Sequence, residues 1–282
     1  MFRSYDQAGL DAQYNLRLRH PEFQEHFDRW ARESAAARRG LRCTLDLPYG
    51  KASGETLDWF PAEKPGAPVH VFIHGGYWRA LDKSDHSFVA PALVQAGHCV
   101  AVVNYALAPS VTVREIVRQV RSAIAWSAKN AGTHGGDPGR ITISGHSAGG
   151  HLTAMALLTD WTAFGGLPRD TVKAGCAVSG LYDLEPIRRC YLNADLKLKP
   201  TDDEPLSPVR HESPAAIPLV VAVGGGESEE FLRQAREFAE KRKSQRQPCQ
   251  YLETPGDNHF TILNQYSDSR APLTRALLKL IG

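Results

Sequence analysis

The residues Gly-His-Ser-Ala-Gly at positions 145 to 149 place one serine between two glycines, each two residues away. The apolar run at 140–145 is typical of a buried strand, and a helical segment follows the serine. A turn this sharp tolerates almost no neighbouring side chains and exposes the serine hydroxyl at the carboxyl end of a sheet. The amino terminus of the next helix favours an anionic intermediate. We therefore interpret Ser147 as a catalytic nucleophile rather than as part of an ordinary tight turn.

A second glycine pair lies in the sequence Phe-Ile-His-Gly-Gly-Tyr-Trp-Arg-Ala, residues 72–80. It follows an apolar run, so it occupies the loop that supplies backbone amides to an oxyanion in hydrolases with such a serine turn. We expect Gly76 and Tyr77 to donate two of these amides and Ala148 to donate a third, with Gly75 shaping the loop. Glycine at such a position lets the backbone approach the negative charge closely.

A serine hydroxyl becomes a good nucleophile at neutral pH only when a histidine accepts its proton. Among the 11 histidines, His259 follows the last predicted strand and is the preferred base on that position alone. His146 flanks the serine, but a side chain at that place in the turn points away from the hydroxyl. We interpret His74 as a hydrogen-bonding residue of its own loop and His151 as a packing or polar contact of the following helix.

A carboxylate must orient the histidine, and the expected chain order is serine, acid, histidine. Glu227 stands closest to the end of the predicted strand at 218–225 and is the first choice. Asp183 follows an earlier strand and stays open as the alternative acid, although it also fits a helix N-cap. Asp257 is more consistent with turn chemistry. The two glutamates at 229–230 fit the first turn of a helix, where acids complement the dipole.

These residues need parallel strands to position them, and apolar runs alternate with helical patterns from residue 68 onward. This alternation predicts a mostly parallel sheet covered by helices on both faces. The helical segment 111–130 carries apolar side chains largely on one face and arginines opposite. Residues 43–50 and 56–62 are predicted as edge strands joined by a turn that contains glycine. The other predicted strands lie at 68–74, 98–107, 140–145, 173–180, 218–225 and 249–254.

Two regions outside this alternation are candidates for a cap over the end of the sheet. Residues 1–40 are predicted to be helical, and Phe23, Phe27 and Trp30 share one helix face there. The alternative for these aromatic residues is simple docking of a helix onto the body. Residues 181–217 form a long, proline-rich connection of a kind that is usually functional or disordered.

Composition argues against several classes of function. A net charge of +2 without a strongly basic face disfavours nucleic acid and anionic membranes as partners. No segment has the apolar length of a membrane span, and the first residues lack the apolar core of a secretory signal. The five cysteines are scattered without metal-binding spacing, so no zinc site is expected and a reduced, cytoplasmic protein fits best. One domain over residues 1–282 is predicted.

With these motifs in view, the chain resembles kynurenine formamidase (arylformamidase), a branch of the α/β-hydrolases near the hormone-sensitive-lipase group. The resemblance covers most of the chain and implies an α/β-hydrolase fold with a small cap from the N-terminal helices and the 181–217 segment. It assigns the nucleophile to Ser147, the acid to Glu227 and the base to His259. The family more often has aspartate where this chain has Glu227. The resemblance rests on HGGYW, GHSAGGH, SGLYDLEP, ESEEFLRQ, NHF and, near the amino terminus, YNLR.

The resemblance also implies a reaction: hydrolysis of an N-formyl arylamine, such as N-formylkynurenine to kynurenine and formate in tryptophan catabolism, without metal or other cofactor. Trp78 and Tyr182 lie near predicted strand ends and are candidates for an aromatic leaving-group pocket, with loop packing as the alternative. A short-chain carboxylesterase with the same triad stays open. More remote is a non-catalytic binding protein on the same scaffold. The expected partner is a small acylated molecule, and a homodimer is left open.

Overall fold

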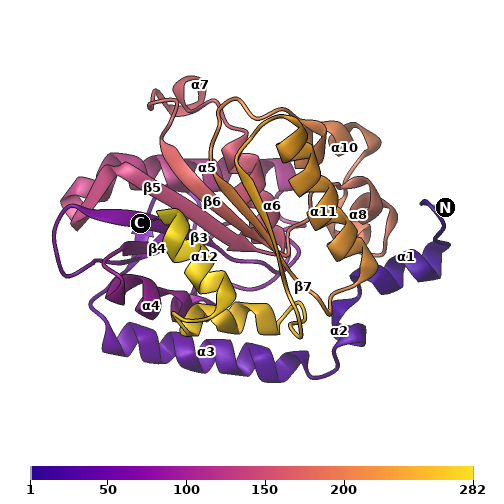
Figure 1. Ribbon diagram of the computed structural model, residues 1–282, viewed down its shortest axis with the longest axis horizontal. Helices are drawn as coiled ribbons and strands as arrows, with labels where there is room; N and C mark the ends of the chain where they lie inside the picture. The colour runs from indigo at the N-terminus through magenta and orange to yellow at the C-terminus, as the bar shows by residue number, and fades with distance from the viewer. Residues whose placement is uncertain (1, 282) are drawn as a thin grey trace.

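The computed structural model describes residues 2–281, and its centre is one eight-stranded sheet (Figure 1). The strands lie in the order β1-β2-β4-β3-β5-β6-β7-β8. All pairs from β4 to β8 are parallel, whereas β1 pairs antiparallel with β2 and β2 antiparallel with β4. The strands are β1 (Thr44–Pro48), β2 (Thr56–Phe60), β3 (Ala67–Ile73), β4 (Cys99–Val103), β5 (Gly136–His146), β6 (Val172–Val178), β7 (Leu219–Gly224) and β8 (Cys249–Thr254).

Each apolar run expected to form a parallel strand does so. β3, β4, β6 and β7 are buried almost throughout, as continuous apolar runs require when helices cover both faces of a sheet. β5 begins at Gly136, earlier than the apolar run indicates. Only one of the two expected edge strands is at the edge: β1 is exposed there, but β2 lies between β1 and β4 with Trp59 and Phe60 buried.

Helices form a layer on each face of the sheet, as Figure 1 shows. On one face α5 and α6 pack against each other and against β3 and β5. On the opposite face η5 contacts α4 and α12, and Tyr266 of η5 donates its hydroxyl to Ser144 Oγ of β5 at 3.0 Å. α11 packs against β7 and β8. The bounds are α4 (Ala90–Gln95), α5 (Val113–Asn130), η3 (Ala131–His134), α6 (Ala148–Leu157), α7 (Trp161–Gly165), α11 (Glu229–Ser244), η5 (Thr261–Ser267) and α12 (Pro272–Ile281).

The N-terminal helices and the segment between β6 and β7 lie outside the two layers. α1 contacts both α8 and α11, and α3 packs along η1 and η2. The aromatic face expected on α3 exists: the rings of Phe23 and Phe27 are 5.5 Å apart, and those of Phe27 and Trp30 are 5.4 Å apart. The bounds are α1 (Gln7–Tyr14), α2 (Leu16–Arg19), α3 (Phe23–Gly40), η1 (Lys83–Asp85), η2 (Ser87–Val89), α8 (Glu185–Arg189), α9 (Asn193–Leu196), α10 (Pro200–Leu206) and η4 (Pro208–Arg210).

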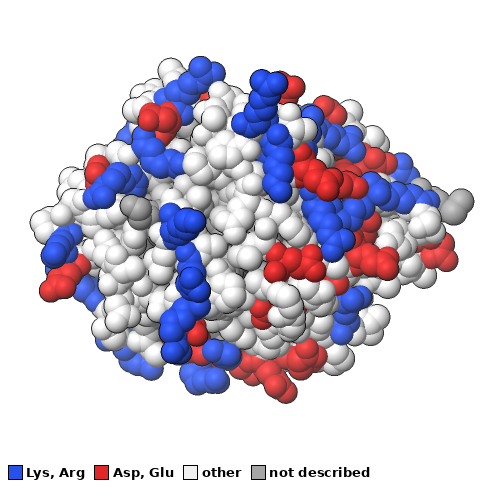
Figure 2. Space-filling view, in the orientation of Figure 1, with Lys and Arg blue, Asp and Glu red and all other residues white. Residues whose placement is uncertain are grey.

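Charged side chains of both signs occur across the face shown in Figure 2, and neither sign covers a broad area of it. Within residues 2–281, no helix combines the length and the hydropathy needed to cross a membrane.

A buried ion pair ties the loop after β3 to the antiparallel edge of the sheet. Lys83 Nζ donates to Asp58 Oδ1 of β2 at 2.6 Å and to Asp46 Oδ1 of β1 at 2.7 Å. The Asp58 side chain is 1% exposed, whereas that of Asp46 is 74% exposed. The buried Asp58 carboxylate also accepts from Asp46 N at 3.0 Å, and Lys83 is its ion-pair partner.

We expect Lys83→Ala to lower the free energy of unfolding by about 3 kcal/mol, because it leaves the buried Asp58 carboxylate without its counter-charge. Chemical denaturation would measure the loss. Lys173→Ala is the matched control, since its partner Asp170 is 74% exposed, and it should leave the unfolding midpoint unchanged. Equal stability of the two variants would contradict the prediction.

Candidate active site

Ser147 occupies a strained turn between β5 and α6, with φ of 56° and ψ of −118°. This left-handed backbone conformation is costly for a residue with a side chain, so surrounding contacts must hold it. The Ser147 amide donates to Val178 O of β6 at 2.8 Å. A β-carbon at Gly149 would lie 2.0 Å from Ile73 O, and one at Gly145 would lie 2.3 Å from Gly149 O. The two flanking glycines are therefore required by close backbone packing.

The loop after β3 passes directly beside this turn. A β-carbon at Gly75 would lie 3.1 Å from Ser147 Cβ. Gly76, Tyr77 and Trp78 follow with φ values of 99°, 50° and 57°. The amides of Gly76 and Tyr77, like that of Ala148, donate no hydrogen bond to any described residue. Unpaired amides beside a serine are the donors that an oxyanion hole requires.

His74 and Tyr105 support the loop after β3 through hydrogen bonds and ring stacking. The Tyr105 hydroxyl donates to His74 O at 2.8 Å, and the two rings stack 4.2 Å apart. His74 Nδ1 donates to Gly75 O at 2.8 Å, as expected for a histidine that bonds its own loop. Burial lowers the pKa of His74 to about 4, so the ring is neutral at pH 7.

His259 and Glu227 meet beyond the ends of β7 and β8. His259 Nδ1 donates to Glu227 Oε2 at 2.6 Å, and both side chains are buried. The other oxygen, Glu227 Oε1, accepts from Gly224 N at 2.8 Å and from the Ser179 hydroxyl. Because Nδ1 carries the donated proton, Nε2 of a neutral His259 ring is an acceptor. This is the tautomer that a general base needs.

The alternative acid lies elsewhere. Asp183 Oδ1 accepts from Glu185 N at 3.3 Å and from Arg210 Nη2 at 3.2 Å. The N-cap of α8 is Leu184 rather than Asp183, so the expected cap role of Asp183 is wrong. Asp257 accepts from Thr261 Oγ1 at 3.1 Å within its own turn. Of the acidic candidates, the structure brings only Glu227 to His259 among the residues that it describes.

His146 contacts the candidate base, which its sequence position did not reveal. Its Nε2 donates to His259 O at 2.8 Å, and the two rings lie 4.6 Å apart. Burial lowers the pKa of His146 well below its ordinary value, so the ring stays neutral. His146 therefore fixes the position of His259 through its backbone. His151 is a packing residue, with Nε2 donating to Leu206 O at 2.8 Å.

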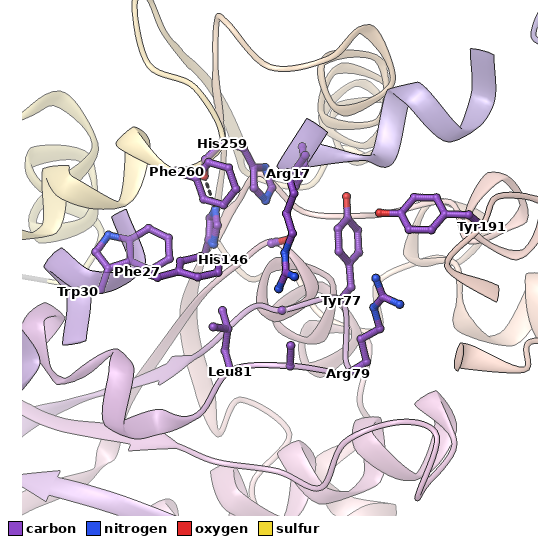
Figure 3. A pocket seen from close by; sticks show the side chains of 14 residues that line it. Arg17, Phe27, Trp30, Tyr77, Arg79, Leu81, His146, Tyr191, His259 and Phe260 are labelled. Atoms are coloured by element: carbon purple, nitrogen blue, oxygen red, sulfur yellow. Dashed lines mark hydrogen bonds between the residues drawn. The ribbon is translucent and has the colours of Figure 1, made fainter. Parts of the chain in front are cut away.

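Ser147 and His259 line one cavity, together with Gly76 and Tyr77 of the loop after β3 (Figure 3). The N-terminal helices form another part of its wall, and the 181–217 segment contributes Tyr191. Both proposed cap regions thus reach the cavity. Phe27 and Trp30 of the aromatic face of α3 line the cavity as well as packing the helix onto the body. Residues that the sequence did not assign to the site are Leu16, Arg17, Phe27, Trp30, Arg79, Ala80, Leu81, His146, Tyr191 and Phe260.

Trp78 and Tyr182, expected in the leaving-group pocket, do not line this cavity. Trp78 is fully buried, and its ring lies nearly perpendicular to that of His151, with ring centroids 5.0 Å apart. Tyr182 is also fully buried and stacks on Phe238 of α11 at 4.3 Å. Both aromatic side chains turn into the core, where burial of their large apolar area is most favourable.

The sheet, the serine turn and the histidine–carboxylate pair define an α/β-hydrolase. Similarity agrees: a kynurenine formamidase from Danio rerio is 36% identical over 255 residues, covering 87% of this chain and 84% of that protein. The chain belongs to the kynurenine formamidase family. The family model BD-FAE also matches residues 59–201. The expected fold class and family are thereby confirmed.

Esterase-type proteins are also similar to this chain. Esterase LipC from Mycobacterium tuberculosis is 31% identical over 239 residues, covering 77% of this chain and 59% of LipC. A candidate thioesterase from Silicibacter sp. has a crystal structure that matches with a TM-score of 0.85 at 30% identity, covering 96% of this chain and 98% of that one. These relatives and the formamidase are hydrolases, and so is this protein.

Ser179→Ala tests the support of the carboxylate. We expect kcat/KM to fall about tenfold, because a hydrogen bond to a charged group is lost. Ser228→Ala is the matched control, since this neighbouring serine is buried and its hydroxyl has no partner among the described residues. Steady-state kinetics would contradict the prediction if both variants kept wild-type kcat/KM.

Gly76→Ala tests the oxyanion loop. A β-carbon there would lie 2.0 Å from Ala80 O, so the loop and its amides must shift. We expect kcat to fall about 100-fold, the usual effect of losing one donor, with a small change in KM. Gly132→Ala is the control, because its β-carbon would meet no atom within 4 Å. A kcat within threefold of wild type would contradict the prediction, because the amides that stabilise the oxyanion would then have to lie outside this loop.

Proposed function

We propose that this protein is an arylformamidase that hydrolyses an N-formyl arylamine to formate and the free amine, with N-formylkynurenine as the preferred substrate. The observation that carries the proposal is the buried hydrogen bond between Glu227 and His259, because His259 lines the same cavity as Ser147 and the loop amides that have no partner within residues 2–281. Membership of the kynurenine formamidase family supports the choice of a formyl group.

The reaction uses three side chains and the backbone. His259 Nε2 accepts the Ser147 proton while Oγ forms a bond to the formyl carbon. The negative charge develops on the formyl oxygen, where the amides of Gly76, Tyr77 and Ala148 stabilise it. The C–N bond then breaks, and His259 gives its proton to the departing arylamine nitrogen.

Deacylation repeats these steps with water. His259 removes a proton from water, the hydroxide attacks the formyl ester of Ser147, and formate leaves as the serine oxygen recovers its proton. Glu227 keeps the proton on Nδ1 of His259 and stabilises the imidazolium that forms twice per cycle. These steps use no metal or organic cofactor.

The cavity wall supports an aromatic leaving group. Phe27, Trp30, Tyr77, Tyr191 and Phe260 all line it. Aromatic side chains pack favourably on an aryl ring and exclude water from the developing charge. This wall, rather than Trp78 and Tyr182, is the proposed leaving-group pocket.

We also propose a cytoplasmic location. All five cysteines are free thiols, and Cys99, Cys176 and Cys190 are buried. Buried free thiols behave as small apolar side chains and are suited to a reducing compartment.

A comparison of substrates tests the reaction. We expect kcat/KM for N-formylkynurenine to exceed that for p-nitrophenyl acetate, and Ser147→Ala to lower both by at least about 10⁴-fold. The esterase relatives make a short-chain carboxylesterase the second candidate. If short esters are hydrolysed orders of magnitude better than the formamide, the carboxylesterase is correct. A wild-type chain that neither turns over these substrates nor reacts with a fluorophosphonate would be a binding protein instead.

A further inference from the structure

Two arginines line a cavity whose other walls are largely apolar. Arg17 comes from α2 and Arg79 from the loop after β3, whereas no aspartate or glutamate of the described chain lines the cavity. The local charge is therefore positive, although Arg17 itself is exposed to solvent at the cavity wall. Such a cavity favours an anionic group on the molecule that enters it.

The two arginines are not equivalent. Arg79 forms an ion pair with Asp195 of α9, and its guanidinium lies 5.8 Å from the Tyr191 ring centroid. The Arg17 side chain makes no hydrogen bond or ion pair within residues 2–281, and its guanidinium lies 5.0 Å from the Phe23 ring centroid. Arg79 is thus neutralised by the protein, while the charge of Arg17 is available to a ligand.

The backbone around Arg17 is held at a defined place relative to the reacting atoms. The Tyr77 hydroxyl donates to Tyr14 O at 2.8 Å, which joins the oxyanion loop to the residues just before α2. Asn15 Oδ1 accepts from Leu18 N at 3.2 Å and caps the turn that carries Arg17. Figure 3 shows the Arg17 side chain entering the cavity from α2, with its guanidinium directed inward.

We propose that Arg17 binds a carboxylate on the leaving-group part of the substrate, and that it selects acidic N-formyl arylamines over neutral ones. A guanidinium presents parallel N–H donors that match the two oxygens of a carboxylate. The carboxylate would dock at the α2 side of the cavity while the formyl group reaches Ser147. This inference rests on the proposed formamidase function for the identity of the reacting group.

Matched substrates with and without the carboxylate test the proposal. Formanilide and 2-formamidobenzoate share the formyl group and the ring, and only the second is an anion. We expect Arg17→Gln to lower kcat/KM for 2-formamidobenzoate about 30-fold, mainly through KM, and to change formanilide less than twofold. Arg17→Lys keeps the charge but not the paired donors, so it should give an intermediate loss.

The control is Arg32→Gln, because Arg32 is an exposed arginine of α3 that does not line the cavity. It should leave both substrates unchanged. For the wild type, KM for 2-formamidobenzoate should rise with NaCl, since the contact is between charges, while KM for formanilide stays constant. This measurement uses only the wild-type protein, so it does not depend on whether a variant folds. An equal loss on both substrates in Arg17→Gln, or no loss on either, would overturn the proposal.

Inhibition by benzoate separates this inference from the formamidase assignment. With p-nitrophenyl acetate as the reporter, benzoate should inhibit the wild type more strongly than benzamide, and Arg17→Gln should remove the difference. If the wild type cleaves esters but no formamide and this pattern still holds, the carboxylate site stands and the formamidase assignment fails. If formamides are cleaved and benzoate inhibits the wild type and Arg17→Gln equally, the formamidase assignment stands and the carboxylate site fails.

Discussion

The hydrogen bond between Glu227 and His259 is the contact on which the rest of the site depends. A buried carboxylate is stable only when donors satisfy it, and here they come from the ends of three adjacent parallel strands: Ser179 after β6, Gly224 at the end of β7 and His259 after β8. The strand pairing brings these ends together, since β7 lies between β6 and β8 in the sheet. The sheet thus positions the Glu227 carboxylate together with the donors that satisfy it.

The serine side of the site obeys a different constraint, which is steric. β3 and β5 are neighbours, and the loop after β3 lies against the turn after β5 so closely that a β-carbon at Gly149 would meet Ile73 O at 2.0 Å. This approach holds Ser147 in its left-handed conformation and brings the amides of Gly76 and Tyr77 beside it. The Tyr77 hydroxyl donates to Tyr14 O, which links the N-terminal helices to the loop after β3.

The cavity is lined by residues that are far apart in the chain, from Leu16 to Phe260. This separation explains which features could be predicted from the sequence and which could not. The strands and the serine turn follow from local patterns, since an apolar run and a glycine-flanked serine carry their own signal. Chain order suggested His259 and Glu227 but left Asp183 open, and only the contact of Glu227 with His259 separates the two carboxylates. Trp78 and Tyr182 were misplaced because proximity to a strand end does not say whether a side chain turns toward the cavity or the core. His146 and Arg17 carried no local signal for the contacts that they make.

The sequence by itself determined the strands, the strained serine corner, the glycine-rich loop and the order of the candidate acid and base, because each depends on backbone sterics or on apolar periodicity within a few residues. The tertiary structure alone decided which carboxylate meets His259, which aromatic side chains face the cavity, and that an unpaired arginine from the first twenty residues enters it. Those outcomes depend on how separate elements pack, and packing is set by the shape and burial of the whole core rather than by any short segment.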